Sequence, residues 1–162
     1  SFHGALMGII IGTYLFSVKK NVPTFFLLDV IACVSPIGIF FGRIANFING
    51  ELVGKITAVP WGVVFPDVDM MTRHPSQLYE ALFEGIFLFF ILNIIIFKKK
   101  YTIGTCSYLF LICYGFFRII SEFFREPDIQ IGYLFNLFSI GTALSFLMIL
   151  TGLAIFSFIQ KK

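Results

Sequence analysis

FFLLDVIACVSPIGIFFGRIANF, residues 25–47, is apolar over almost its whole length and carries its one basic residue, Arg43, close to one end. A helix needs roughly 20 mostly apolar residues to cross a bilayer, and this stretch supplies them. Asp29 lies near the other end, and we interpret it as a structural residue. The stretch predicts a transmembrane helix whose polar end leads directly into a loop.

Further apolar stretches lie on both sides of this one, at about residues 1–18, 76–97, 101–119 and 137–159. The composition agrees with them, because 58% of the residues are hydrophobic, 13% are charged and the mean hydropathy is +0.93. A soluble domain has roughly 25% charged residues, so lipid must cover much of this surface. We predict an all-α membrane protein, a polytopic helical bundle with five spans, in which residues 1–162 form a single transmembrane domain.

The lysines and arginines separate to opposite ends of these spans. With five spans, the lysines at 19–20, 98–100 and 161–162 fall on one side, and every arginine and both histidines fall on the other. Cytoplasmic loops of membrane proteins are enriched in basic residues, so we place the lysine side in the cytoplasm. Arginine is favoured where a planar fork grips a phosphate or carboxylate, so we expect the chemistry at the outer leaflet. The net charge of +3 is too small to indicate nucleic acid as a partner.

Residues 50–75 form the longest polar segment, and we predict a small extracytoplasmic loop subdomain there, inserted between spans two and three. Trp61 and Phe65 can anchor this loop at the membrane interface, where such rings are enriched. The chain begins with a serine that leads straight into apolar sequence, which we interpret as a fragment that lacks its N-terminus. The cysteines lie in apolar runs without a C-x-x-C pair, which predicts neither a disulfide framework nor a metal site.

The densest polar motif is GRIANFINGELVGK, residues 42–55. Arg43, Asn46 and Asn49 recur at three-residue spacing, so a helix places them near one face. The glycines that follow allow the backbone to approach a ligand closely. This pattern fits a binding site, and it equally fits an interfacial helix end whose arginine reaches the lipid headgroups.

A second motif, RIISEFFREPD, occupies residues 118–128. Arg118 and Glu122 are four residues apart and can pair on a helix, and Arg125 continues that face. An arginine beside apolar rings is costly in hydrocarbon, which favours a cavity or a partner for Arg118. A structural ion pair at a helix end is the alternative.

Two further segments contain polar residues near the same ends. In residues 73–84, Ser76 can cap a helix that starts there, and Glu80 and Glu84 share a face; we predict a mainly structural role for this segment. His3 lies at the outer end of the first span. Histidine is the commonest general base near neutral pH, so His3 is a candidate base, although an interfacial histidine is often structural.

Five blocks of sequence resemble the prolipoprotein diacylglyceryl transferase family and follow the order found in that family. They are SFHGALMG at 1–8, GRIANFINGELVGK at 42–55, VPWGVVFP at 59–66, RHPSQLYEALFEG at 73–85 and FRIISEFFREPDIQ at 117–130. The chain departs from the family pattern at Ala5, Val53 and Lys55, where a glycine, an aromatic residue and an arginine are usual. These changes fall at supporting positions.

The resemblance implies an enzyme of the bacterial cytoplasmic (inner) membrane, multi-pass, with its active site facing the outer leaflet. It would transfer a diacylglyceryl group from phosphatidylglycerol to the cysteine of a lipobox-containing preprolipoprotein, forming a thioether and releasing glycerol phosphate. Its partners would be these two substrates and membrane lipid. The resemblance implies no cofactor and no metal. The positions that match functional ones of the family are Arg43, Asn46, Glu51, Gly54, Arg118 and Glu122, with His3 at a long-discussed one.

The residue patterns and the resemblance together predict a phosphate clamp. Arg43 and Arg118 come from different spans and are expected to hold the phosphate from two directions, with Glu122 orienting Arg118. Glu51 is expected to bind the glycerol headgroup or steady Arg43. We place His3, Arg43 and Arg118 in the catalytic set, and the substrate-binding set is Arg43, Asn46, Asn49, Glu51, Gly54, Arg118, Glu122 and Arg125.

Two other functions are considered. The main alternative is a protein that is not an enzyme, namely an anion or lipid transporter with an arginine-lined outer cavity. Charges near the middle of the bilayer and broken helices would be typical of such a transporter. A non-catalytic membrane scaffold is the third reading, and it leaves the arginines and the Asn- and Gly-rich turn without a role.

Overall fold

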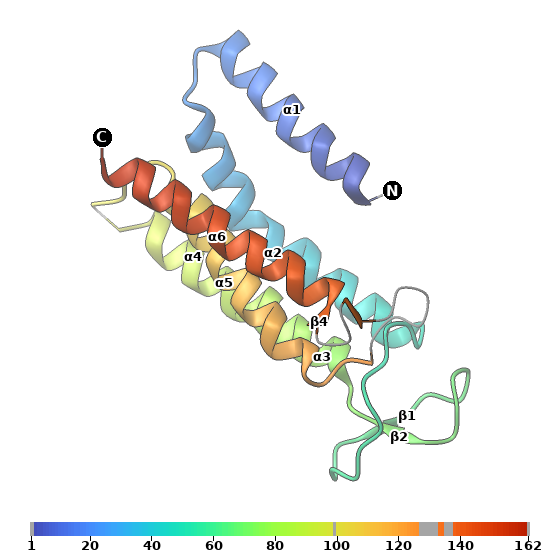
Figure 1. The fold of residues 1–162 in the computed structure, drawn as a ribbon. Helices are drawn as coiled ribbons and strands as arrows, with labels where there is room; N and C mark the ends of the chain where they lie inside the picture. The colour runs from blue at the N-terminus through green and yellow to red at the C-terminus, as the bar shows by residue number, and fades with distance from the viewer. Residues whose placement is uncertain (1, 99, 127–132, 135–137, 162) are drawn as a thin grey trace.

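The computed structural model describes residues 2–98, 100–126, 133–134 and 138–161. Within these ranges the chain forms five long helices (Figure 1). The third is one continuous rod, in which α3 passes through a π-helical segment into α4. The helices are α1 (Phe2–Lys20), α2 (Thr24–Ile48), α3 (Ser76–Glu80), the π-helical segment (Ala81–Phe87), α4 (Leu88–Ile96), α5 (Thr105–Glu122) and α6 (Ile140–Gln160).

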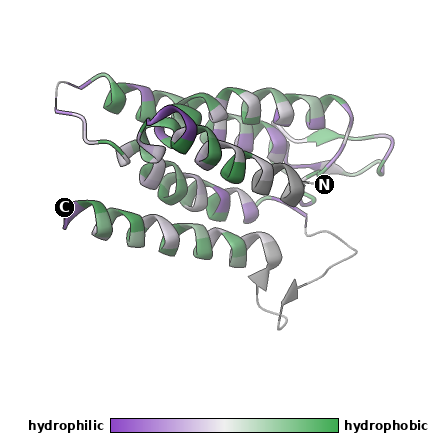
Figure 2. Cartoon of the chain, turned by 90° about the horizontal axis from the view of Figure 1, so that it is seen from above, coloured by the Kyte–Doolittle hydropathy of each residue, from purple (hydrophilic) through white to green (hydrophobic). Residues whose placement is uncertain are grey.

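The helices lie where the apolar runs predicted them. Among the described residues, three are long and apolar enough to cross a membrane, namely Thr24–Ile48, Ser76–Ile96 and Gly141–Gln160. Figure 2 shows α6 apolar along its described turns and hydrophilic at its C-terminal end. The prediction of an all-α membrane protein is confirmed.

The helices α5 and α6 lie side by side, and small residues let them approach closely. A Cβ atom added to Gly115 would meet the carbonyl oxygen of Ser145 at 2.7 Å. One added to Gly152 would meet the side chain of Ile112 at 2.7 Å. Small residues at such contacts are typical of helix pairs in membranes, where apolar burial drives association less than close packing does.

The end of the bundle that holds the lysines is fastened by Asp29 of α2, which is fully buried. Its carboxylate accepts hydrogen bonds from the backbone N–H of Gly104 at 2.5 Å and of Ser107 at 2.6 Å. The hydroxyl groups of Ser107 and Tyr101 donate to it as well. An acceptor at the first turn of a helix satisfies N–H groups that have no partner within the helix. Asp29 therefore joins α2 to the start of α5.

Residues 50–75 fold back on themselves through a short antiparallel pair, β1 (Val63–Val64) with β2 (Thr72–Arg73), in which Val63 lies opposite Arg73. A second pair consists of β3 (Tyr133–Leu134) and β4 (Phe138–Ser139). The buried Arg73 ties the loop together by donating to Asp69 at 2.6 Å, to Glu126 at 2.9 Å and to the carbonyl of Gly54 at 2.9 Å. Its hydrogen bonds lower the pKa of Asp69 below the usual value.

Candidate functional site

Three helices bring arginines and glutamates together at the end of the bundle that is remote from Asp29. The guanidinium of Arg43 on α2 contacts Glu80 at 2.9 Å and Glu84 at 3.0 Å. Arg118 on α5 pairs with the same Glu80, lies 3.8 Å from Glu84, and contacts Glu122 at 2.9 Å. We call these five residues the arginine cluster.

The cations and anions of the arginine cluster are buried to different extents. The side chains of Glu80 and Glu84 are 0% exposed, whereas those of Arg43 and Arg118 are 15% and 11% exposed. Buried charges persist only when they are paired and hydrogen-bonded, and removing one partner of such a pair costs about 3–5 kcal/mol. Glu80 and Glu84 are therefore more deeply buried than the two arginine side chains, which keep some accessible surface.

The rod that carries Glu80 and Glu84 changes its helical type at this point. Glu80 is the last residue of α3, and Glu84 lies within the π-helical segment Ala81–Phe87. Such segments are rare and occur frequently at functional sites. Glu84 from this segment and Glu80, which directly precedes it, both contact Arg43 of the neighbouring helix α2.

The predicted pair of arginines is brought together through shared carboxylates. The predicted ion pair between Arg118 and Glu122 is confirmed, at 2.9 Å. Arg125 lies at the edge of the arginine cluster, with its guanidinium 3.7 Å from Glu80. That these residues bind a substrate stays a prediction.

The turn that follows α2 is held by its backbone. The N–H of Glu51 donates to the carbonyl of Asn46 at 2.9 Å, and that of Asn49 donates to Ala45 at 2.9 Å. Glu51 is exposed, and its carbonyl accepts a hydrogen bond from the Gln77 amide at 2.7 Å. Among the described residues, Arg43 is paired with Glu80 and Glu84, and the role predicted for Glu51 stays a prediction.

Gly54 lies where three chain segments cross. Its N–H donates to the carbonyl of His74 at 3.2 Å, and it forms an isolated β-bridge with Arg125. A Cβ atom here would overlap the carbonyl oxygen of His74 and lie 2.8 Å from that of Phe124. Only glycine fits this crossing, which joins the loop to the end of α5.

The structure contradicts the predicted role of Ser76, and it does not describe the side chain of His3. Ser76 does not cap α3: the N-cap position is Pro75, and the Ser76 hydroxyl donates instead to the carbonyl of Leu52 at 3.2 Å. The capping prediction was wrong because the helix begins at Ser76 itself and the returning loop offers an acceptor. The backbone of His3 belongs to α1, and its side chain lies outside the described part of the structure.

Sequence reasoning missed Glu80 and Glu84 as members of the site. Their segment was interpreted as the start of a helix with a structural role. A usable signal existed, because two carboxylates inside an apolar span require cations, and the arginines fall at the same end.

Aromatic side chains of the loop contact α3 and the residues that follow α5. The indole N–H of Trp61 donates to the hydroxyl of Tyr79 at 2.7 Å, and His74 Nδ1 lies 3.2 Å from the same hydroxyl. The rings of His74, Tyr79 and Phe124 contact one another edge to face. Trp61 remains largely exposed, as an interfacial anchor would be.

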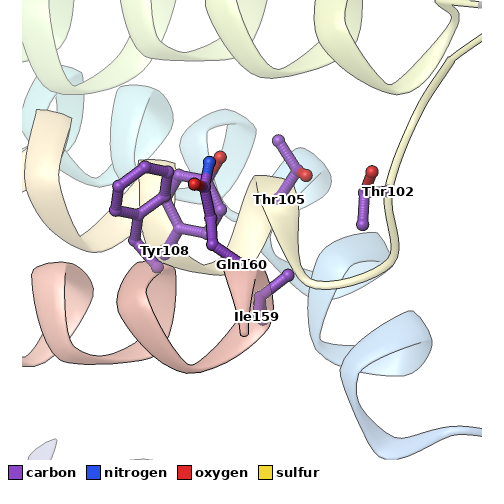
Figure 3. A pocket seen from close by; sticks show the side chains of 6 residues that line it. Thr102, Thr105, Tyr108, Ile159 and Gln160 are labelled. Atoms are coloured by element: carbon purple, nitrogen blue, oxygen red, sulfur yellow. The ribbon is translucent and has the colours of Figure 1, made fainter. Parts of the chain in front are cut away.

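A separate cavity of about 230 Å³ lies between the start of α5 and the end of α6, at the lysine end (Figure 3). It is lined by Thr102, Thr105, Tyr108, Phe156, Ile159 and Gln160. None of the predicted site residues is among these six. In the described residues, no group of three metal-binding side chains gathers anywhere.

Comparison with known proteins places the chain in a family. A model of the family "Prolipoprotein diacylglyceryl transferase" matches residues 1–158. The chain is 53% identical over 156 residues to the phosphatidylglycerol–prolipoprotein diacylglyceryl transferase of Rickettsia bellii (strain OSU 85-389), covering 94% of the chain and 59% of that relative. It is 46% identical over 159 residues to the protein of the same name from Wolbachia pipientis wMel, covering 96% and 60%.

The chain thus spans about 59–60% of the length of these curated relatives. The family match extends over nearly the whole chain and includes both arginine-bearing helices. On this evidence the chain belongs to the prolipoprotein diacylglyceryl transferase family.

Proposed function

We propose that the intact protein transfers the diacylglyceryl group of phosphatidylglycerol to the lipobox cysteine thiol of a preprolipoprotein, the first step of lipoprotein maturation. The observation that carries this proposal is the arginine cluster, in which Arg43 and Arg118 come from two helices and their side chains remain partly exposed. The names of the relatives support it. They give no support to the transporter alternative.

At the glyceryl carbon one bond forms and one breaks, and the thiol also loses its proton. The thiol sulfur forms a bond to the glyceryl carbon, the bond from that carbon to the phosphate oxygen breaks, and glycerol phosphate leaves. The thiol proton passes to a base, for which His3 is our candidate. An ordinary cysteine thiol has a pKa of about 8.5, so it needs such help near neutral pH.

The arginines act on the leaving group. A phosphodiester carries a single negative charge, and the departing phosphate monoester carries more, so negative charge grows on phosphate during bond breaking. Donors that meet this growing charge stabilise the transition state more than the bound substrate, and so they raise the rate. Arg43 and Arg118 are the side chains that we assign to this task, with Asn46, Asn49, Glu51, Gly54, Glu122 and Arg125 around the headgroup.

We also propose an orientation. The end of α1, the end of α4 and the C-terminal end of α6 lie at the same end of the bundle (Figure 1). We place that end in the bacterial cytoplasm and the arginine cluster at the outer leaflet of the inner membrane, with residues 50–75 as an extracytoplasmic loop subdomain. Phosphatidylglycerol then reaches the site laterally from the bilayer.

The test is product formation by the intact protein in membranes that contain phosphatidylglycerol. A synthetic lipobox peptide should gain the mass of one diacylglyceryl group, and the same peptide with serine in place of cysteine should not. Membranes with phosphatidylethanolamine as their sole phospholipid serve as a second control. A transporter would leave the peptide mass unchanged in every membrane, and that result would reject the proposal.

A further inference from the structure

We propose that Glu80 is a positioning residue that holds Arg43 and Arg118 in register for a phosphodiester. This inference rests on the proposed function and deepens it. Glu80 ends α3, in the rod between the two arginine-bearing helices, and its side chain is fully buried. It pairs at short distance with an arginine of α2 and an arginine of α5.

The two oxygens of Glu80 serve different arginines. Oε2 lies 2.9 Å from Arg43 Nη1, and Oε1 contacts Arg118 Nη1. Oε1 also lies 3.7 Å from Arg125 Nη1. A single rigid carboxylate that pairs with two guanidiniums restricts their separation, because neither arginine can shift without lengthening a short ion pair.

The neighbouring carboxylates do not make short contacts with both arginines. Glu84 contacts Arg43 at 3.0 Å but lies 3.8 Å from Arg118, beyond a hydrogen bond. Glu122 pairs with Arg118 at 2.9 Å and sits on the same helix as its partner. Glu80 is therefore the bridge with short contacts to both arginines among the described residues.

Glu80 is more deeply buried than the two arginines that it connects. The side chain of Glu80 is 0% exposed, whereas the side chains of Arg43 and Arg118 remain 15% and 11% exposed. A guanidinium has further N–H donors beyond the ones used here. Glu80 thus offsets the repulsion between the two cations and leaves their remaining N–H donors for the phosphate.

The experiment measures kcat and KM for phosphatidylglycerol with the intact protein in membranes, per folded molecule. Glu80→Gln keeps the size of the side chain and loses the charge, so kcat should fall roughly ten- to hundredfold. Glu80→Asp keeps the charge, is the variant expected to fold, and is one methylene too short to reach both arginines. It should therefore also lose at least roughly tenfold in kcat.

Asp29→Asn is the matched control, because it also converts a fully buried carboxylate to an amide, at the other end of the bundle. It should lower thermal stability and leave kcat per folded molecule unchanged. If Glu80 acted in folding alone, its variants would likewise lose thermal stability and keep an unchanged kcat per folded molecule.

A coupling measurement completes the test. Because Glu80 acts through the arginines, Glu80→Gln should cost much less in a protein that already carries Arg43→Lys. Wild-type kcat in folded Glu80→Asp, or fully multiplicative losses in the double variant, would overturn the inference. A wild-type protein that yields no lipidated peptide would instead overturn the proposed function, so the two failures are distinguishable.

Discussion

The two ends of the bundle both contain fully buried carboxylates, and they satisfy them in different ways. At the lysine end, Asp29 accepts hydrogen bonds from neutral groups, namely backbone N–H and hydroxyl groups at the start of α5. At the other end, Glu80 and Glu84 contact arginines whose side chains remain partly exposed. A carboxylate enclosed by neutral donors closes a contact between helices, whereas one paired with exposed cations holds those cations ready for a further anion.

The largest expected difference between the two ends is their accessibility from outside the cell, because an introduced cysteine is either labelled or not labelled. A membrane-impermeant thiol reagent added to intact cells should label Asp67→Cys and should not label Lys98→Cys. The native cysteines Cys33 and Cys106 are buried, so an unmodified control reports the background. The reverse pattern would put the arginine cluster in the cytoplasm and refute the outer-leaflet site.

Loss of an arginine should have the next largest effect. Arg43→Ala and Arg118→Ala should each lower the rate of peptide lipidation by roughly ten- to hundredfold, because a charge-assisted contact worth about 1.5–3 kcal/mol is lost. Arg43→Lys and Arg118→Lys should rescue only partly, since lysine lacks the planar fork. Normal turnover in both alanine variants, at matched membrane abundance, would refute the phosphate clamp.

The lysine end should respond in stability rather than in activity. Asp29→Asn should destabilise the protein by roughly 1–3 kcal/mol, because buried N–H donors at the start of α5 lose their charged acceptor. Thermal unfolding in detergent measures this change. If lipidation per folded molecule fell as strongly as in the arginine variants, the two ends would not differ in the way described here.

The smallest effect is expected in the loop and depends on pH. The pKa of Asp69 is lowered by its hydrogen bonds with Arg73, so this contact stabilises the loop above the unfolded pKa of Asp69 and is lost as the pH falls through the folded one. Amide exchange at Val64 and Thr72 should therefore accelerate only in strong acid. Asp69→Asn should remove this dependence, and the remaining contacts of Arg73 with Glu126 and Gly54 should keep the loop folded.

Much of the fold could be predicted from the sequence, because apolar runs of membrane length leave few alternatives. The run 25–47 became Thr24–Ile48, and 101–119 became Thr105–Glu122, the latter shifted because Gly104 in a left-handed conformation starts the helix later. The strands β1 and β2 have two residues each, too few for an alternating pattern to reveal them.

The site was only partly predictable, since its residues are separated in sequence and joined by packing. The Arg118–Glu122 pair lies on one helix, so its spacing was sufficient. The contacts of Arg43 with Glu80 and Glu84 depend on how two helices pack, which no local pattern encodes. Ser76 was misjudged for the same reason, because its acceptor belongs to a loop that returns from α2.

The π-helical segment Ala81–Phe87 has a consequence for how the two halves of one rod are phased. An α-helix advances by about 100° per residue, so adding or removing one residue rotates everything beyond it. The segment therefore sets the rotation between Glu80, which contacts arginines of α2 and α5, and Leu88 and Leu92, which are fully buried in the core that the same helices form. Inserting or deleting one residue in it would turn either the carboxylates or the leucines away from these two helices.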